Sequence, residues 1–154
     1  MLIILIILFL IAGGLSSIFV GSAVKGWYVF LKKPFFAPPA LVFVPVWTIL
    51  YILLAVFYWR LDKIYDKSNN KKLIEKLKGI FILQMVLNFM WTPVFFGLRN
   101  IVGGLIIILA LDLLVVWITW LSYKIDKKCF YISLIYLVWL LYASALNLGI
   151  FILN

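Results

Sequence analysis

Long stretches without charge alternate with short polar connections along this chain. Five stretches contain no charged residue, or only Asp112, and they cover residues 1–24, 34–59, 79–98, 100–123 and 129–154. A helix of about 20 apolar residues crosses the ~30 Å hydrocarbon core of a bilayer. The pattern therefore predicts an all-α protein, an integral membrane bundle of five transmembrane helices. We expect these helices at residues 2–24, 41–60, 79–98, 101–122 and 129–152.

The composition supports this prediction. Of the 154 residues, 68% are hydrophobic, 18% are aromatic and only 12% are charged. A water-soluble domain of this size has too little interior for so much apolar side chain. Almost nothing is left for a separate soluble domain, so we expect one membrane domain over residues 1–154.

The net charge of +9 lies in and beside the connections between the expected helices. We therefore expect no nucleic-acid partner and favour anionic lipid head groups instead. Lysine and arginine number ten in residues 60–78 and 124–128, against four in residues 25–33 and at Arg99. The positive-inside rule then places the N-terminus and the connections 61–78 and 123–128 in the cytoplasm.

Several kinds of chemistry lack their usual residues. The chain has no histidine, the commonest metal ligand and general base, and its single cysteine is Cys129. It also lacks P-loop, dinucleotide-binding, nucleophile-elbow and zinc-protease motifs. We expect no metal and no cofactor, and enzymatic activity is left open.

Residues 27–59 are the most unusual part of the sequence. A basic connection broken by the Pro38–Pro39 pair leads without a charge into an aromatic helix. Irregular backbone at membrane depth is tolerated where it is buried in protein or lines a cavity. We predict that the connection covers a pocket whose wall includes Trp47 and Tyr51, four residues apart on one helix face. An aromatic residue near a helix end also fits a role as an interfacial anchor.

Two later helices each carry polar and aromatic residues on one face. The third has Gln84, Asn88, Trp91, Thr92 and Phe95, and the fifth has Tyr136, Trp139, Ala143, Leu146 and Asn147. Offsets of three and four residues align each set, and amides in lipid are costly unless paired, so both faces should point inward. Asn88 is either a hydrogen-bond partner between helices or a ligand anchor. Ala143 either admits a close helix neighbour or leaves space for a ligand.

Other membrane residues have structural interpretations. Pro93 should kink its helix or be accommodated by neighbours. Asp112 has no basic partner in any membrane segment, so we expect a protonated carboxyl or one that accepts hydrogen bonds from an indole, tyrosine or asparagine. We favour this structural role over a proton relay, because no second titratable group accompanies it. Gly13, Ser17 and Gly21 share one face and predict close packing, within the bundle or between subunits.

Seven strings in this sequence match a known family. They are WYVFLKKPFFAPP at Trp27–Pro39, PVWTILY at Pro45–Tyr51, QMVLNFMW at Gln84–Trp91, FFG at Phe95–Gly97, DLL at Asp112–Leu114, YLVW at Tyr136–Trp139 and ALN at Ala145–Asn147. They cover the chain from end to end in the family's order. The chain resembles the tryptophan-rich sensory protein and translocator protein family, TspO/MBR, also called the peripheral benzodiazepine receptor family.

The resemblance implies a five-helix bundle, usually a homodimer, with a pocket beneath the first connection. Family members bind porphyrins, isoquinoline carboxamide or benzodiazepine drugs and, in animals, sterols; bacterial members look able to degrade protoporphyrin in light through pocket tryptophans. Trp47 and Trp139 are the implied catalytic pair, and the resemblance favours a ligand role for Asn88 and Ala143. Carried over by motif position, the ligand-binding residues are Tyr28, Pro38, Trp47, Asn88, Trp91, Thr92, Trp139, Ala143 and Leu146.

Two departures from the family pattern change this expectation. No basic residue follows Lys128, so the short sterol-binding pattern cannot form after Tyr142. This argues against a sterol ligand and for a bacterial-type member in the cell membrane. Ile135 stands where the family often has proline, so the start of the last helix is expected to differ.

Our principal hypothesis is a membrane receptor for protoporphyrin-like tetrapyrroles and for hydrophobic drug-like ligands. An aromatic slot suits the flat face of a porphyrin, and the lysines of the first connection suit its propionates. The alternative is a small transporter of porphyrins or other amphipathic molecules, although five helices without a detected repeat are an unusual number for alternating access. A third possibility is an enzyme that oxidises the porphyrin it binds.

Overall fold

The computed structural model describes the backbone of residues 1–154 and every side chain except those of Ser17, Ser22, Val24 and Ala40. The described backbone is helical throughout its regular segments. These are α1 (Leu2–Lys25), α2 (Trp27–Phe30), the 3₁₀ turn η1 (Ala40–Val42), α3 (Phe43–Tyr65), α4 (Lys71–Thr92), the π-helical turn η2 (Pro93–Gly97), α5 (Ile101–Ile125) and α6 (Lys127–Leu153). Five helices are long and apolar enough to cross a membrane, which confirms the predicted fold class.

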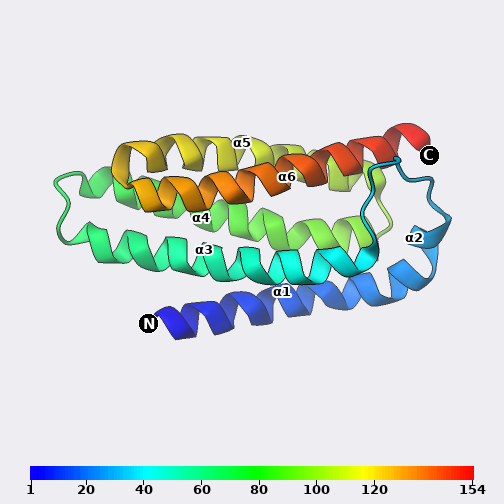
Figure 1. The fold of residues 1–154 in the computed structure, drawn as a ribbon, viewed down its shortest axis with the longest axis horizontal. Coiled ribbons are helices and arrows are strands. Elements are labelled where there is room, and N and C mark those ends of the chain that lie inside the picture. Colours follow the sequence, from blue (N-terminus) through cyan, green and yellow to red (C-terminus); the bar gives the residue numbers. More distant parts are fainter.

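The five long helices run side by side along the length of the molecule (Figure 1). The N-terminus, residues 66–70 and the junction at Asp126 lie toward one end, which we call the lysine end. The short helix α2, residues 31–39 and the C-terminus lie at the opposite end. We call this the lid end, and residues 31–39 the lid loop.

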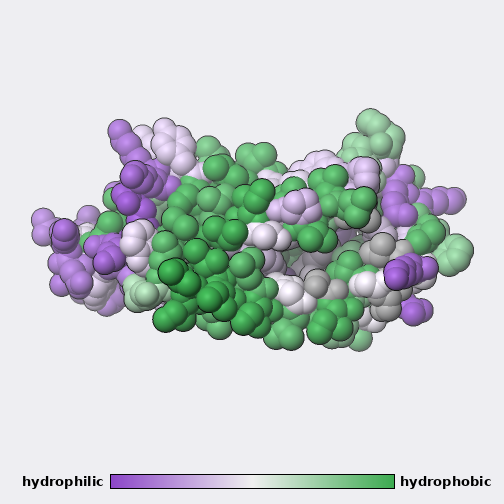
Figure 2. Space-filling model, turned by 60° about the horizontal axis from the view of Figure 1, so that its bottom comes forward, coloured by the Kyte–Doolittle hydropathy of each residue, from purple (hydrophilic) through white to green (hydrophobic). Residues whose placement is uncertain are grey.

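The surface seen in Figure 2 has an apolar band between two polar ends. Many large apolar side chains along the helices are exposed, Ile3, Leu113 and Val138 among them. Such a surface is costly in water and suits a hydrocarbon solvent. The buried core lies between α3, α4, α5 and α6, whereas α1 covers one side of it and has Ala23 as its one buried residue among the side chains described.

The polar segment 61–78 is more helical than its composition suggested. The composition suggests a solvated connection there, with room for a short helix, but α3 continues to Tyr65 and α4 begins at Lys71. The reason is that Leu61, Ile74 and Leu77 are fully buried in the core while the charged residues between them face outward. An amphipathic pattern of this kind extends a helix beyond the membrane span that hydrophobicity alone predicts.

Pro93 interrupts the third membrane span, as predicted. The α-helix α4 ends at Thr92 and the chain continues as the π-helical turn η2. Proline lacks the N–H that an interior helical residue would donate, and its ring crowds the preceding turn. The wider turn resolves this crowding and lets Leu98 N donate to Pro93 O at 2.9 Å.

The small residues of α1 do not form one continuous packing face. Gly13 lies against α3, because a Cβ built on it would be 2.3 Å from Cε2 of Tyr51. Gly21 differs, since no described atom lies within 4 Å of the same construction. The side chain of Ser17 is outside the described part of the structure. The expected close packing is therefore confirmed within the bundle at Gly13, and Gly21 does not share it.

Asp126 joins three helices at the lysine end. Its carboxylate accepts hydrogen bonds from Arg60 Nε at 2.6 Å and Arg60 Nη2 at 2.8 Å, and also from the backbone N–H of Cys129 at 2.9 Å. The residue thus ends α5, caps α6 and binds α3. The hydrogen bonds from Arg60 lower the pKa of the Asp126 carboxyl to about 2. Charge-assisted, bidentate pairs of this kind are the stronger ion pairs in proteins.

Candidate ligand site at the lid end

The lid loop is attached to α6 at its start and its middle. Asn154 Oδ1 accepts from Lys32 N at 3.0 Å, and Asn154 Nδ2 donates to Lys32 O, also at 3.0 Å. Farther along the loop, Tyr142 donates its hydroxyl to Phe36 O at 2.9 Å. Backbone groups of an irregular segment need such partners when the segment is packed against a helix.

A close approach between the loop and α6 supports these hydrogen bonds. A Cβ built on Gly149 would lie 2.9 Å from Cγ of Pro34, so the glycine lets the proline ring rest on the helix. This residue type is needed because any larger side chain would displace the loop. The lid loop therefore has a defined position over the C-terminal half of α6.

Beneath the loop lies an apolar cluster centred on Phe95, Leu146 and Ile150. All three are at most 5% exposed. Partly buried residues of α2, the lid loop, α3, α4, η2 and α5 pack around them, namely Trp27, Tyr28, Leu31, Ala37, Phe43, Trp91, Phe96 and Ile101. The cluster thus closes the lid end and is separate from the core between the longer helices.

Trp91 forms one wall of this cluster. Its ring stacks on Phe95 with the centroids 5.2 Å apart and the planes 12° from parallel. The indole Nε1 is buried and has no acceptor among the described atoms. An unpaired buried donor is uncommon in proteins and calls for an explanation.

Tyr28 covers the same cluster from α2. Its ring centroid lies 6.4 Å from that of Phe95 and 5.3 Å from that of Phe96. Lys33 Nζ sits 4.7 Å from the Tyr28 ring centre, which places a cation of the lid loop at this wall. Burial raises the pKa of the Tyr28 hydroxyl above its usual value, and nearby Tyr142 raises it further. The hydroxyl therefore stays a neutral donor and acceptor at physiological pH.

Trp139 belongs to a second aromatic wall, on α6. Its ring contacts Phe43 at 6.1 Å and Tyr142 at 5.4 Å between centroids, and its Nε1 is again buried with no acceptor in the described structure. Trp47 follows Phe43 by one turn of α3 and lies 5.6 Å from Tyr51 between ring centroids. The two tryptophans of the expected catalytic pair are thus on different helices, α3 and α6, and Trp139 contacts α3 at Phe43, one turn before Trp47.

Asn88 lies at the centre of a buried chain of hydrogen bonds. Its Oδ1 accepts from the Tyr51 hydroxyl at 3.0 Å, and its Nδ2 donates to the Tyr136 hydroxyl at 2.8 Å. Tyr136 in turn donates to Gln84 Oε1 at 3.2 Å. The third and fifth predicted helices correspond to α4 and α6. Their predicted inward faces are confirmed here, because Gln84, Asn88 and Tyr136 are at most 4% exposed. The amide of Asn88 joins α3, α4 and α6 through side chains.

The remaining expected site residues surround these walls. Ala143 is 7% exposed in the main core, one turn beyond Trp139 on α6, and Leu146 belongs to the lid-end cluster. Thr92 ends α4 and is half-buried, while Pro38 is half-buried in the lid loop. The structure therefore gathers Tyr28, Trp91 and Leu146 around Phe95, with Trp47, Trp139 and Asn88 deeper along α3, α4 and α6.

One known protein family matches nearly the whole of this sequence. The family model described as TspO/MBR family matches residues 4–153. The chain belongs to the TspO/MBR family. It is 38% identical over 142 residues to the tryptophan-rich protein TspO of Archaeoglobus fulgidus, covering 92% of this chain and 89% of that relative.

Other TspO/MBR relatives come from distant organisms. Protein CrtK of Rhodobacter capsulatus is 32% identical over 143 residues, which cover 93% of this chain and 86% of the relative. The human translocator protein is 29% identical over 132 residues, which cover 86% and 77%. With membrane-spanning helices and this family membership, the protein is an integral membrane protein of the TspO type.

Several residues of the candidate site were not predicted from the sequence. Phe43 and Phe36 contribute ring contacts, and Tyr142 and Asn154 hold the lid loop. Tyr142 follows Trp139 by three residues, so helical spacing could have indicated it. Asn154 gave no such signal, because its partner Lys32 is 122 residues away in the chain.

Asp112 is not held as expected. Its Oδ1 is buried and accepts no hydrogen bond from any described residue. Of the two expectations, the one of an indole, tyrosine or asparagine donor is therefore wrong at this atom, and a protonated carboxyl stays a prediction. The residue lies beside Ser144 of α6, whose hydroxyl is also without a well-formed hydrogen bond. The acid is on α5 and is not among the residues of the lid-end cluster, and we assign it no part in ligand binding.

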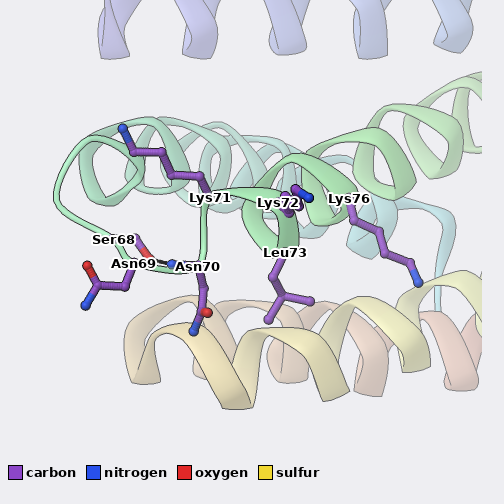
Figure 3. A pocket seen from close by; sticks show the side chains of 7 residues that line it. All are labelled: Ser68, Asn69, Asn70, Lys71, Lys72, Leu73 and Lys76. Atoms are coloured by element: carbon purple, nitrogen blue, oxygen red, sulfur yellow. Dashed lines mark hydrogen bonds between the residues drawn. The ribbon is translucent and has the colours of Figure 1, made fainter.

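Two hollows of the structure differ in place and size. A broad surface depression of about 710 Å³ opens at the lysine end (Figure 3), far from the expected site residues. A small internal cavity of about 10 Å³ borders Gln84 and Tyr136, close to the space that one water molecule needs. We locate the candidate site from the residues at the lid end, and not from cavity size.

Proposed function

We propose that this TspO/MBR protein binds a flat, mostly apolar ligand of the porphyrin type at the lid end. The observation that carries the proposal is the pair of buried indole N–H groups, Trp91 Nε1 and Trp139 Nε1, which have no acceptor among the described atoms. A ligand with polar atoms on an aromatic body would supply the acceptors that the protein does not.

The aromatic and apolar residues at the lid end suit a flat, mostly apolar ligand. Trp91 on Phe95 and Trp139 beside Phe43 provide aromatic faces, and Leu146 lies buried in the cluster beneath the lid loop. Aromatic pairs gain about 0.5–1.5 kcal/mol beyond the area they bury. The walls are in mutual contact, so the ligand would enter by separating aromatic side chains under the lid loop.

The basic residues of the lid loop would meet the acidic groups of the ligand. Lys32 and Lys33 are both exposed, and the ammonium of Lys33 already lies over Tyr28. Porphyrin propionates at the rim of the site would pair with these lysines, whereas a neutral drug-like ligand such as an isoquinoline carboxamide would use only the aromatic walls. Pro38, Thr92 and Asn88 complete the proposed binding set.

The test is a titration of the purified protein with protoporphyrin, followed by quenching of tryptophan fluorescence. Replacing Ala143 by leucine adds volume beside Trp139 and should weaken binding by about 1–3 kcal/mol, the usual effect of overfilling a packed site. The control is Ala145→Leu, two residues away at an exposed position of the same helix. Unchanged affinity in a folded Ala143→Leu protein would place the binding site elsewhere.

We also propose a light-dependent loss of bound porphyrin through the indoles of Trp47 and Trp139. The supporting observation is that Trp139 of α6 contacts Phe43 of α3, and that Trp47 lies one turn farther along the same helix beside Tyr51. Phenylalanine keeps most of the buried aromatic area, so the double Trp47→Phe, Trp139→Phe variant should bind within about tenfold of wild type while losing photochemistry. The exposed Trp120 offers a matched Trp→Phe control. Unchanged photochemistry in the double variant would contradict the photochemical proposal, and only the binding function would remain.

The location of the protein, its assembly and its alternative role in transport are further proposals. We propose a bacterial cell membrane as the location, with the lysine end in the cytoplasm because ten of the fourteen basic residues flank it. We propose a homodimer from the family resemblance, which cross-linking in native membranes tests. A transporter of porphyrins is the alternative, and saturable binding without uptake into vesicles would exclude it.

A further inference from the structure

The depression at the lysine end differs in chemistry from the site at the lid end. It is lined by hydroxyl, amide and ammonium side chains with one leucine, and no carboxylate is among its lining residues: Ser68, Asn69, Asn70, Lys71, Lys72, Leu73 and Lys76. In Figure 3 the three lysines extend from the first turns of α4 in different directions, Lys71 away from Lys76, with Ser68, Asn69 and Asn70 in the preceding turn. The surface therefore offers hydrogen-bond donors and positive charge together.

The lysines of the depression are not neutralised by the protein. Lys72 and Lys76 are four residues apart on α4, where like charges repel. Among the side chains that the structure describes, the two ion pairs are Arg60 with Asp126 and Lys78 with Asp62. Neither pair involves a lysine of the depression.

Two further carboxylates lie in this region. Asp66 is exposed in the preceding turn. Glu75 accepts a hydrogen bond from the Tyr65 hydroxyl, and Lys71 lies over the Tyr65 ring at 5.4 Å. Neither carboxylate forms an ion pair with Lys72 or Lys76 among the described side chains, so an anion bound beside these two lysines would relieve the repulsion between them.

Aromatic residues mark the depth of this region in the bilayer. Trp117 and Trp120 are exposed on α5, and each has a lysine over its ring, Lys76 at 4.8 Å and Lys124 at 3.5 Å from the ring centres. Exposed tryptophans of membrane proteins lie at the level of the lipid head groups. Lys76 thus connects the depression to the lipid-facing surface of α5.

We propose that the depression binds the head group of an anionic phospholipid. The phosphate would lie beside the ammonium groups of Lys72 and Lys76, which share one face of α4, while Lys71 would add positive charge to the same end. The polar side chains of residues 68–70 would bond the rest of the head group. The acyl chains would run from Trp117 along the exposed apolar residues of α5, such as Leu113. This site is independent of ligand binding at the lid end.

The experiment offers the detergent-purified protein an equimolar mixture of phosphatidylglycerol and phosphatidylcholine and measures retained lipid by native mass spectrometry. We expect wild type to retain phosphatidylglycerol at least fivefold over phosphatidylcholine. The triple variant Lys71→Gln, Lys72→Gln, Lys76→Gln should lose that preference. The control triple Lys63→Gln, Lys127→Gln, Lys128→Gln removes the same charge from the same end and should retain it.

Other outcomes would overturn the proposal. If both triple variants lose the preference for phosphatidylglycerol equally, the lipid is attracted to the basic surface in general. If wild type shows no preference, the proposed site does not exist. Displacement of phosphatidylglycerol by millimolar inorganic phosphate would indicate a free-anion site. If the triple variant fails to fold, Lys72→Gln with Lys76→Gln carries the same test, and Lys72→Arg with Lys76→Arg should keep the preference.

Discussion

Asn154 closes two hydrogen bonds on the backbone of Lys32, 122 residues earlier in the chain. The amide of Asn154 reproduces the donor and acceptor pattern of a neighbouring peptide group, so the start of the lid loop is paired as a strand edge would be. Its Nδ2 also donates to Ile150 O at 2.8 Å, which fixes the side chain on the last turn of α6. The position of the loop is therefore set from the far end of the sequence.

Removing this contact should loosen the lid loop without unfolding the bundle. Asn154→Ala deletes three hydrogen bonds, one to Ile150 and two partly solvated ones to the lid loop. The two to the loop are together worth about 1 kcal/mol or somewhat more. We expect faster exchange of the Lys32 amide hydrogen and an increase of about fivefold or more in the dissociation rate of a lid-end ligand. Hydrogen-exchange mass spectrometry measures the first effect even when no ligand is present. Asn69→Ala at the lysine end is the control, and unchanged exchange at Lys32 would contradict the prediction.

Gly13 is required by the ring of Tyr51. In Gly13→Ala the new methyl group would lie within contact distance of three ring atoms, the nearest at 2.3 Å. The ring would have to move away from Asn88, so the hydrogen bond between them would be weakened. We expect a loss of about 1–3 kcal/mol in the free energy of unfolding.

A second glycine of the same helix provides the control for this substitution. Gly21→Ala meets open space among the described atoms, and alanine is favoured over glycine inside a helix by about 0.8–1.0 kcal/mol. In detergent, Gly13→Ala should therefore melt below wild type, whereas Gly21→Ala should melt above it. Equal melting temperatures for the two variants would show that Tyr51 can move without a loss of stability.

The helical bundle was predictable because lipid imposes a simple rule on sequence. Each span must be apolar over about 20 residues, and the uncharged stretches met this rule. Prediction was poorer where the helices leave the membrane, since Leu61 and Ile74 extend α3 and α4 through amphipathic packing in a segment rich in charge.

The candidate site was predictable only in part. Helical spacing placed Asn88 and Tyr136 on inward faces, but their mutual hydrogen bond depends on the relative rotation of α4 and α6, which spacing within one helix does not specify. Phe43 was missed for the same reason, because its partner Trp139 is on another helix. Asp112 was expected to have hydrogen-bond donors that the fold does not bring to its Oδ1.

Asp126 should make stability depend on pH in the acid range. Its pKa is lowered from the model-peptide value of 3.8 to about 2 by the Arg60 hydrogen bonds. The stabilisation is therefore fully present above pH ~4 and is lost as the pH falls through about 2, because the unfolded chain binds the proton first. At neutral pH we expect Asp126→Asn to lose about 1–2 kcal/mol, less than the full shift implies because the pair is partly solvated.

The measurement is the melting temperature of wild type and Asp126→Asn between pH 2 and pH 7. Wild type should lose stability between about pH 4 and pH 2, and the variant should show a flatter curve over the same interval. Asp66→Asn, at an exposed position of the neighbouring turn, is the matched control. A variant that keeps the wild-type slope would show that other carboxyl groups carry the acid sensitivity.

Asp112 should contribute little to the stability of the fold. Its Oδ1 is buried without a hydrogen-bond partner among the described atoms, so Asp112→Leu removes an unsatisfied polar atom and strands no donor to it. We expect the variant to melt at the wild-type temperature or above it, since an unpaired polar group in an apolar setting costs roughly 1–3 kcal/mol. A marked fall in melting temperature would instead restore the structural role that the sequence suggested.

The alternative role of Asp112 is distinguished by Asp112→Asn, which keeps the shape and removes the acid. A binding protein predicts unchanged porphyrin affinity, because the acid lies on α5 outside the aromatic walls. A proton-coupled transporter predicts that pH-dependent porphyrin uptake into proteoliposomes is abolished while the melting temperature is unchanged. Only a carboxyl that exchanges a proton during transport would give that combination, because an amide offers similar hydrogen bonds but cannot ionise. Loss of uptake with stability intact would therefore favour the transporter over the receptor.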